Sequence, residues 1–394
     1  MKFFRLRSHG FVFSVILAVF AAVSPHLVEA SDRSETDSRF RETNSSGSKN
    51  MFWIEGTILN RYIFDSLINN SGGRTGDKND ESFLEVYSNS KLHFNDNLLL
   101  HTNLALRQVS EREDGGGESY LPRKHYFLKG YGIVAEELSL EYREERFLMG
   151  MGKFNPTFGY ALNSRYYGVG GTKIINSYQL SEKLGFYVAM VTPIANARIN
   201  FFRNDSTFLS RSLLNDRGAY SLDKDMGNVS NILDNFSITL DFITDNNYRF
   251  DLGFRKLATD DPNKKSEFGI VMGMECLFEE TLETLGVAPA MEFVLLGNSD
   301  GEPEKLTGFT LVNIPIFYDR WNFGISWSAK ISKYEKIKFS NIAQVSVGYT
   351  FQNGLSVDFS RKYENDYRSI SVGKVENEKF SSWGIGLSYM LKFE

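Results

Sequence analysis

Apolar and polar residues alternate along much of the chain, in stretches of about ten residues separated by polar breaks. The clearest example is the segment 83–109, in which two alternating stretches flank Asn95-Asp96-Asn97. The segment 236–255 repeats this scheme around Asp245-Asn246-Asn247. Such alternation predicts β-strands with one apolar and one polar face, and the Asn/Asp triplets predict the hairpin turns between them.

The same pattern predicts about sixteen strands, with fourteen or eighteen as the alternatives. The expected strands are 51–63, 82–94, 98–109, 136–144, 147–154, 183–191, 197–203, 234–244, 248–257, 266–278, 287–298, 307–318, 321–331, 340–351, 355–363 and 381–393. Some of the connections between them are short turns, such as 145–146 and 319–320. Others are long loops, at 64–81, 110–135, 155–182, 204–233 and 364–380.

Two architectures can produce strands of this kind. A soluble β-sandwich hides the apolar face in its core, whereas a transmembrane barrel turns that face to lipid around a polar lumen. Short turns at one rim and long loops at the other are typical of transmembrane barrels, and an even number of strands closes without an exposed edge. The predicted fold is therefore an all-β, transmembrane antiparallel β-barrel of about sixteen strands.

The N-terminal residues predict export. Three basic residues precede the apolar run 11–23, and small residues near Ala30 suit a cleavage site, so residues 1–30 are expected to be a signal peptide. The apolar run is shorter than the roughly 20 residues that a membrane-spanning helix needs. Residues 31–50 are almost free of apolar side chains and are expected to be a disordered lead-in. The barrel is expected to occupy 51–394.

Composition excludes several classes of function. The chain has 44 basic and 49 acidic residues, for a formal net charge of −5, so no basic surplus favours nucleic acid. A single cysteine, Cys276, excludes an intramolecular disulfide framework. His93 and His101 fall near one turn on the expected polar face, but the neighbouring Lys91 repels cations. No metal site, cofactor or catalytic residue is therefore expected, and the protein is not expected to be an enzyme.

The last predicted strand carries a resemblance to a known class. SSWGIGLSYMLKFE resembles the C-terminal targeting strand of bacterial outer-membrane proteins, in which alternating apolar residues lead to a terminal aromatic residue. The matching residues are Leu387, Tyr389, Leu391 and Phe393. Glu394 departs from the pattern, because it moves the aromatic residue to the penultimate position. The resemblance implies that the barrel-assembly machinery is a partner.

A second resemblance covers residues 136–186. The stretch EELSLEYREERFLMGMGKFNPTFG, followed by YQLSEKLGF, is similar to a segment found in Gram-negative porins. These porins include relatives of the phosphate-selective type. The matching residues are Gly152, Lys153, Phe154, Asn155, Pro156, Phe158 and Gly159. The resemblance implies that the loop 155–182, with Arg165 and Lys173, folds into the lumen. The alternative is an outer loop that leaves the lumen open.

The expected lumen face carries acidic and basic residues in equal number, which gives no clustered charge of one sign. The residues expected to line the pore are Lys91, Arg107, Arg143, Lys153, Arg165, Lys173, Asp241, Arg249, Asp251 and Arg255. The leading hypothesis is a porin in the outer membrane of a Gram-negative bacterium, which passes small hydrophilic solutes by diffusion with weak charge selectivity. Its expected partners are outer-membrane lipid, the assembly machinery and these solutes; a homotrimer is compatible with it.

Two alternatives share some of these features. A plugged or narrow barrel would serve as a structural or adhesive surface protein and would have the same strands. A secreted, soluble β-rich binding protein would place the apolar faces in a core. Channel conductance separates the first alternative from a porin, and extraction without detergent would indicate the second.

Overall fold

A computed structural model describes residues 53–69, 78–109, 130–159, 173–215, 217, 226–244, 247–276, 285–334, 337–370 and 374–393. The expected signal peptide (1–30), the lead-in (31–50) and Arg165 lie outside these residues. Within the described part of the chain, no helix is both long enough and apolar enough to cross a bilayer.

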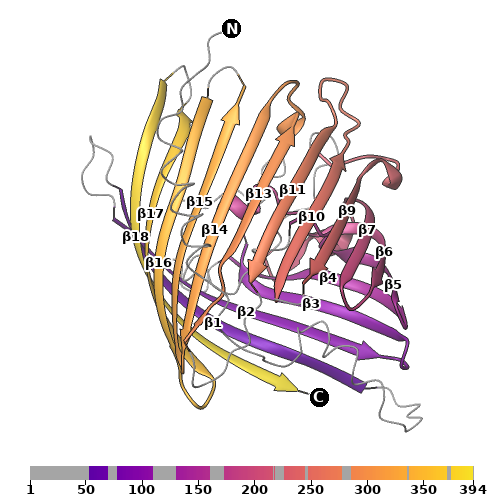
Figure 1. Cartoon of the computed structure of the whole chain (residues 1–394), viewed down its shortest axis with the longest axis horizontal. Helices are drawn as coiled ribbons and strands as arrows, with labels where there is room; N and C mark the ends of the chain where they lie inside the picture. Colours follow the sequence, from indigo (N-terminus) through magenta and orange to yellow (C-terminus); the bar gives the residue numbers. More distant parts are fainter. Residues whose placement is uncertain are drawn as a thin grey trace. The chain divides into compact units, whose positions relative to one another are not determined.

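The described residues form one closed antiparallel sheet, which confirms the predicted barrel (Figure 1). Its sixteen long strands are β1 (Trp53–Asn69), β2 (Lys78–His93), β3 (Leu98–Gln108), β4 (Tyr131–Glu144), β5 (Phe147–Phe154), β6 (Lys183–Val191), β7 (Ala195–Asn204), β9 (Phe236–Ile243), β10 (Tyr248–Leu257), β11 (Glu267–Cys276), β13 (Ala290–Gly297), β14 (Leu306–Tyr318), β15 (Trp321–Lys333), β16 (Ile337–Thr350), β17 (Leu355–Ile370) and β18 (Lys374–Phe393). The connections add the two-residue strands β8 (Ser212–Leu213) and β12 (Gly286–Val287), the helix α3 (Lys173–Asn176) and three 3-10 turns, at Phe208–Ser210, Ile232–Asp234 and Ser299–Gly301.

The barrel closes between its first and last strands. β1 pairs with β2 on one side and with β18 on the other, and Gly56 lies opposite Phe393 in this seam. A Cβ atom on Gly56 would lie 2.7 Å from the Phe393 ring, so the glycine makes room for the aromatic residue that ends β18. Because each of the sixteen long strands pairs with a neighbour on both sides, the described sheet closes on itself and has no edge strand.

Side chains of the strands alternate between the outside and the inside as the sequence predicts. Leu240 and Leu252 are 39% and 44% exposed on the outer wall, whereas Thr239 and Asp251 retain only 5% and 1% exposure on the inner face. An outer wall made of exposed leucine, isoleucine, phenylalanine and methionine would be unstable in water and is suited to lipid. The soluble sandwich is therefore excluded.

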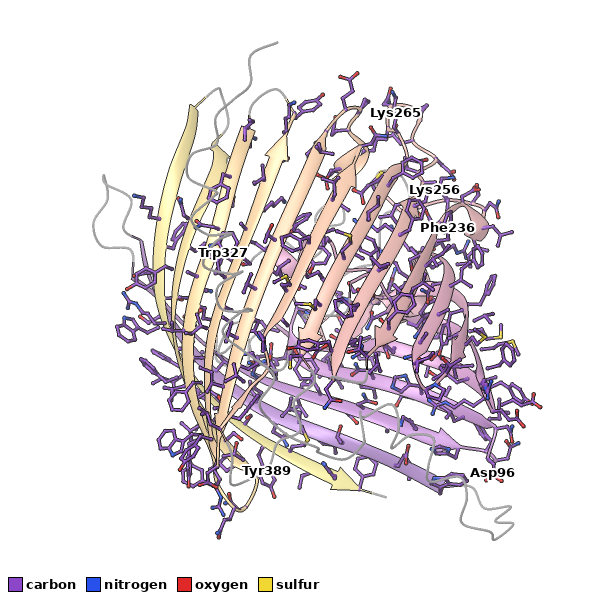
Figure 2. All side chains as sticks on the ribbon, viewed as in Figure 1. Asp96, Phe236, Lys256, Lys265, Trp327 and Tyr389 are labelled. Atoms are coloured by element: carbon purple, nitrogen blue, oxygen red, sulfur yellow. The ribbon has the colours of Figure 1, made fainter. Side chains whose placement is uncertain are left out.

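Two of the predicted long loops are wrong. β1 and β2 extend through most of 64–81, and β17 and β18 pair as far as Ile370 and Lys374 and so occupy most of 364–380. The sequences of these extensions, such as KNDE in β2 and ENDYRSI in β17, are rich in polar residues and do not alternate regularly, so the pattern that marks a strand in lipid is lost although the backbone pairing continues. The short-turn edge also has one longer connection, 277–289, between β11 and β13. Figure 2 places Asp96, in a short turn, and Lys265, in a longer connection, at opposite ends of the barrel.

The interior is not uniformly polar. Inward-facing residues of eight strands join residues of the loop 155–182 in one buried apolar cluster. Its members include Phe154, Phe158, Ile174, Tyr178, Leu180, Tyr187, Phe202, Leu257, Val294, Leu296, Phe309 and Leu311. Burying a side chain of this kind contributes roughly 1.5–3 kcal/mol relative to exposing it. Part of the lumen is thus packed as tightly as a protein core.

Candidate functional site: a loop-narrowed lumen

The loop 155–182 enters the barrel directly after β5. Gly152 has a φ of 134°, and a Cβ at this position would lie 2.4 Å from the carbonyl oxygen of Leu138, so the turn inward needs glycine. Phe158 then packs into the apolar cluster with 2% exposure. Gly159 follows with a φ of 83° and brings the backbone against the carboxylate of Glu292 on β13. The first part of the loop therefore reaches the wall opposite to the strand it leaves.

The last part of the loop is fastened to the same wall. The Tyr178 hydroxyl donates a hydrogen bond to Glu292, and its ring lies 5.1 Å from that of Phe309 on β14. Arg255 on β10 donates a hydrogen bond to the carbonyl oxygen of Tyr178 and lies 4.5 Å above the ring of Phe158. One arginine thus holds the beginning and the end of the loop. These contacts bear out the inward loop that the porin resemblance implies.

A buried ionic cluster anchors the loop on the other side, next to β5. Lys153 Nζ lies 3.0 Å from Glu182 Oε2 and 3.3 Å from Asp205 Oδ2, and it also donates a hydrogen bond to the carbonyl oxygen of Leu209. Arg217 donates two hydrogen bonds to Glu182. Lys153 and Asp205 have no side-chain exposure. Opposite charges buried this deeply hold one another in place, because either one alone would be strongly unfavourable.

Glu182 makes the anchoring dependent on pH. Burial alone would raise the pKa of Glu182, but Arg217 and Lys153 outweigh it and lower the pKa from 4.5 to about 2. The group binds its proton more weakly when folded, so its contribution to stability is fully present above pH 4.5 and is lost as the pH falls through about 2.

This shift predicts how a Glu182→Gln variant behaves. The variant lacks the carboxylate at every pH, so the difference in unfolding free energy from the native chain is expected to shrink as the pH is lowered from 4.5 toward 2. The measurement is denaturant unfolding of both proteins in lipid vesicles across this range. A difference that stays constant with pH would contradict the proposed role of the carboxylate.

Three of the predicted pore-lining residues face a part of the interior that stays open to water. Lys91, Arg107 and Arg143 on the inner face of β2, β3 and β4 keep 23%, 19% and 33% side-chain exposure. Each is paired with an acid: Lys91 with Glu55 at 3.0 Å, Arg107 with Glu136 at 3.4 Å and Arg143 with Glu141 at 2.9 Å. The charges on this wall are therefore locally balanced.

The other predicted residues lie against the packed side or are only partly described. Lys153 and Arg255 are buried in loop contacts and do not face open lumen. Asp241 and Asp251 face each other across β9 and β10, and Arg249 lies 3.9 Å from Asp241 and 3.8 Å from Glu275. Lys173 begins α3, but its side chain is not among those described.

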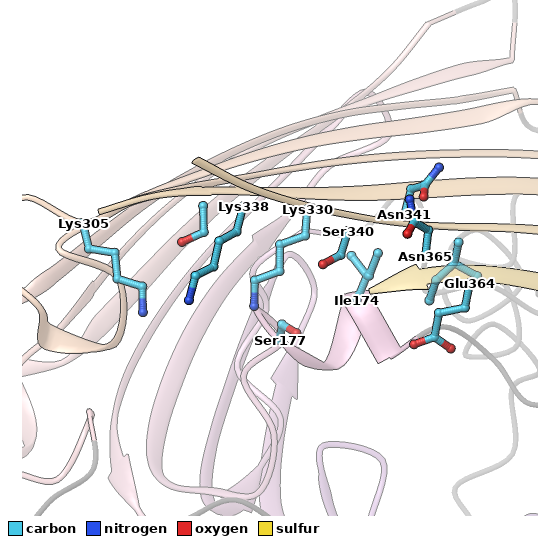
Figure 3. Close-up of a pocket in the computed structure, with 11 residues that line it drawn as sticks. Ile174, Ser177, Lys305, Lys330, Lys338, Ser340, Asn341, Glu364 and Asn365 are labelled. Carbon is cyan, nitrogen blue, oxygen red and sulfur yellow. The ribbon is translucent and has the colours of Figure 1, made fainter. Parts of the chain in front are cut away.

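A cavity of about 280 Å³ opens between α3 and the far wall. Lys305, Lys330 and Lys338 direct their ammonium groups toward the loop segment that carries Ser177 (Figure 3). Further lining residues are Ile174, Ser332, Ser340, Asn341, Ile342, Glu364 and Asn365. Three lysines against one glutamate make the lining positive overall. Hydroxyl and amide groups among them can hydrogen-bond a hydrated solute.

Each lysine of this cavity has a different environment. Lys305 Nζ lies 2.6 Å from Asp300 Oδ2, so its charge is partly compensated. Burial would raise the pKa of Asp300, but the hydrogen bond from Lys305 lowers it below its ordinary value, which keeps the pair ionised. Lys330 lies 5.6 Å above the Phe309 ring, and Lys338 is exposed. Lys330 and Lys338 are the cations best placed to meet a solute.

Sequence patterns missed several residues that build this site. The strand expected at 340–351 begins at Ile337, so Lys338 fell outside every predicted strand. Arg217 and Asp205 lie in a connection without periodicity, and nothing in that segment points to a buried ion cluster. Tyr178 lies within the segment similar to porins, which was the available signal for the inward loop.

The two histidines of the lumen wall lie apart in different contacts. His93 stacks on Trp53, with ring centroids 4.2 Å apart, and its Nε2 lies 3.3 Å from Glu55. His101 contacts Asn89 at 3.0 Å and Glu137 at 3.3 Å. In the part of the chain that the structure describes, no three His, Cys, Asp or Glu residues are grouped in a way that could hold a metal ion.

Comparison with known proteins identifies the fold. No family model and no curated protein matches the chain in sequence. Among solved structures, OprB of Pseudomonas putida matches with a TM-score of 0.56 and 12% identity, over 85% of this chain and 94% of that one. OmpT, an outer-membrane protein of Vibrio cholerae, matches with a TM-score of 0.51 and 10% identity, over 86% and 97% of the two chains. At this identity the likeness shows the fold alone, which is that of a porin-like outer-membrane β-barrel.

Proposed function

We propose that the protein is a diffusion porin, which passes small hydrophilic solutes along the open side of the lumen. The observation that carries the proposal is the contrast between two sides of the interior. Inward charges on β2, β3 and β4 keep contact with water, while the described ends of the loop, 155–159 and 173–182, pack against β10, β13 and β14. A polar, hydrated wall beside a fixed constriction lets small solutes keep their hydrogen bonds and excludes large ones.

The proposal includes export and assembly but no catalysis. Cleavage of 1–30 delivers the chain to the periplasm, and the alternating outer face of β18, which ends in Phe393, serves as the recognition strand for the assembly machinery. Outer-membrane lipid surrounds the barrel, which is compatible with a homotrimer. Balanced pairs on β2–β4 and a positive cavity under α3 favour a weak preference for anions.

Planar-bilayer recording of the refolded protein tests the proposal. We expect discrete channel openings, and we expect the Lys330→Glu/Lys338→Glu double variant to shift the reversal potential in a salt gradient toward cations. Arg146→Glu/Arg320→Glu, which inverts two charges in the short turns at the opposite edge, is the matched control. A double variant with the same reversal potential as this control would contradict a role of the cavity in conduction.

A second candidate, a plugged barrel that acts as a surface protein, is favoured by the apolar cluster that spans part of the interior. Tyr178 and Phe158 fix the loop by buried contacts on the far wall, as a permanent plug would be fixed. The absence of conductance from a correctly folded barrel would favour this candidate over the porin.

A further inference from the structure

The outer wall of the barrel carries charge of essentially one sign. Among the outward-facing strand residues whose side chains the structure describes, the charged ones are Arg203, Lys256, Lys333, Arg361, Lys379 and Glu144. The single acid, Glu144, ends β4 at the short-turn edge. The whole chain has a net charge of −5, so this basic set does not reflect a general excess of cations.

The basic residues gather toward the edge that carries the longer connections. Arg203 and Lys256 are each the last but one residue of a strand that ends there, and Lys333 is the last residue of β15. Figure 2 shows Lys256 close to the end of the barrel from which Lys265 projects. The outer wall is thus apolar over most of its height and basic near this one edge.

The basic residues lie beside a band of aromatic rings. Lys256 is in register with Phe236 on β9 and with Phe268 on β11. Neighbouring outer-wall rings continue across five strands, with centroids 5.3–6.4 Å apart, through Phe186, Phe201, Phe236, Phe254 and Phe268. Long cationic side chains at the border of an apolar band keep their stems in hydrocarbon and place their charge among lipid headgroups.

Arg361 is held most firmly. Its guanidinium carbon lies 4.1 Å from the Trp383 ring centroid and 5.1 Å from that of Tyr363, and its Nη2 donates a hydrogen bond to the Ser381 hydroxyl at 3.2 Å. Tryptophan and tyrosine prefer the boundary between hydrocarbon and headgroups, which places Arg361 at that depth.

No carboxylate among the described residues forms an ion pair with Arg203, Lys256, Lys333 or Arg361, hereafter the outer basic set. On the lumen face of β2, β3 and β4, by contrast, Lys91, Arg107 and Arg143 each have an acidic partner. Four cations on a lipid-facing wall that have no carboxylate partner in the described structure would be stabilised by an anion outside the protein, at the depth of the lipid headgroups.

In outer-membrane barrels the longer connections lie on the extracellular side, so this edge belongs to the outer leaflet. We propose that the outer basic set is a binding surface for the phosphate groups of lipids in that leaflet. Arginine offers a planar fork of donors that matches phosphate oxygens, and lysine adds point charges on flexible stems. The surface faces away from the lumen, so it takes membrane lipid and not a permeating solute. This role does not depend on whether the barrel conducts.

The test is lipid retention by the refolded full-length barrel in detergent, measured by native mass spectrometry with diphosphoryl lipid A. The native chain is expected to retain this lipid, and neutralising the set by R203Q/K256Q/K333Q/R361Q is expected to weaken retention about fivefold for each charge removed. Dephosphorylated lipid A is expected to bind both proteins equally weakly. Equal retention of diphosphoryl lipid A by the native and neutralised proteins would overturn the proposal.

Two controls make the outcome specific. Neutralising four inward cations instead, Lys91, Arg143, Lys330 and Lys338, is expected to leave lipid retention unchanged. Displacement of the lipid by millimolar inorganic phosphate would show that the set recognises free phosphate and would also overturn the proposal. A folded barrel gives a compact band on unheated gels. If the fourfold variant does not, the lipid retention of Arg361→Gln is compared with that of Arg361→Lys, which keeps the charge. Equal retention by these two variants would contradict a role of the charge.

Discussion

Lys153→Met is expected to lower the free energy of unfolding of the barrel by about 3–5 kcal/mol, because it removes one partner from a buried ionic cluster. Glu182 and Asp205 would remain buried; Glu182 would keep Arg217 and the more distant Arg107 Nη2, 3.7 Å from its Oε1, whereas Asp205 would lose the ammonium group that lies 3.3 Å from it. The methionine fills much of the space of the lysine stem, so the loss comes mainly from uncompensated charge and not from a cavity. Guanidinium unfolding in lipid vesicles measures the change.

Lys91→Met is the matched control. Lys91 also lies on the inner face of a strand and also has a glutamate at 3.0 Å, but its side chain is 23% exposed where that of Lys153 has no exposure. Its pair with Glu55 is screened by water, and its loss should cost no more than about 1 kcal/mol. Similar costs at the two positions would show that burial does not decide the value of these pairs.

Leu240→Arg is expected to destabilise the barrel by roughly 2–4 kcal/mol, since Leu240 lies in the middle of β9 on the lipid-facing wall. Ser346→Arg places the same side chain on the inner face of β16, beside the small residues Gly324 and Ser360. That variant should stay within about 1 kcal/mol of the native chain. Reversible unfolding in a bilayer measures both, and equal costs would mean that the faces are assigned wrongly.

Thr239, the inward neighbour of Leu240, is a poor choice for that control. Its hydroxyl lies 2.9 Å from that of Thr157 in the loop 155–182, and its exposure is 5%. An arginine there would displace the loop. The measured loss of unfolding free energy would then include the loss of loop packing as well as any effect of the face on which the residue lies.

The outer wall could be predicted from the sequence because lipid imposes a simple rule. Along β9, Phe236, Ile238, Leu240 and Phe242 face outward, and each strand in lipid must repeat such a pattern. In the hairpins β2–β3 and β9–β10, the predicted start and end of each strand lie within three residues of the observed ones. The exception is the start of β2, which has a polar extension. Where strands extend beyond the membrane, as at β17 and β18, the rule no longer applies and the prediction of loops was wrong.

The interior could be predicted only in part. β13 reads AMEFVLLG, with Val294 and Leu296 facing inward as well as Met291, Phe293 and Leu295 facing outward. An apolar run without alternation indicates a strand buried on both faces, and this was the available sign that something covers β13 from inside. Which segment covers it depends on long-range contacts of the loop 155–182, and periodicity carries no information about such contacts.

The same long-range contacts determine when the loop can dock during assembly. Tyr178 bonds to Glu292, 114 residues later, and Arg255, 77 residues later, bonds to Tyr178. Neither partner is in place until β10 and β13, the ninth and eleventh of the sixteen long strands, have joined the sheet, and contacts of such sequence separation slow folding. A nascent barrel therefore passes through a stage in which its wall is largely formed while the loop is still undocked. The finished constriction is thus fixed by strands of the second half of the chain, although the residues that narrow the channel belong to the first half.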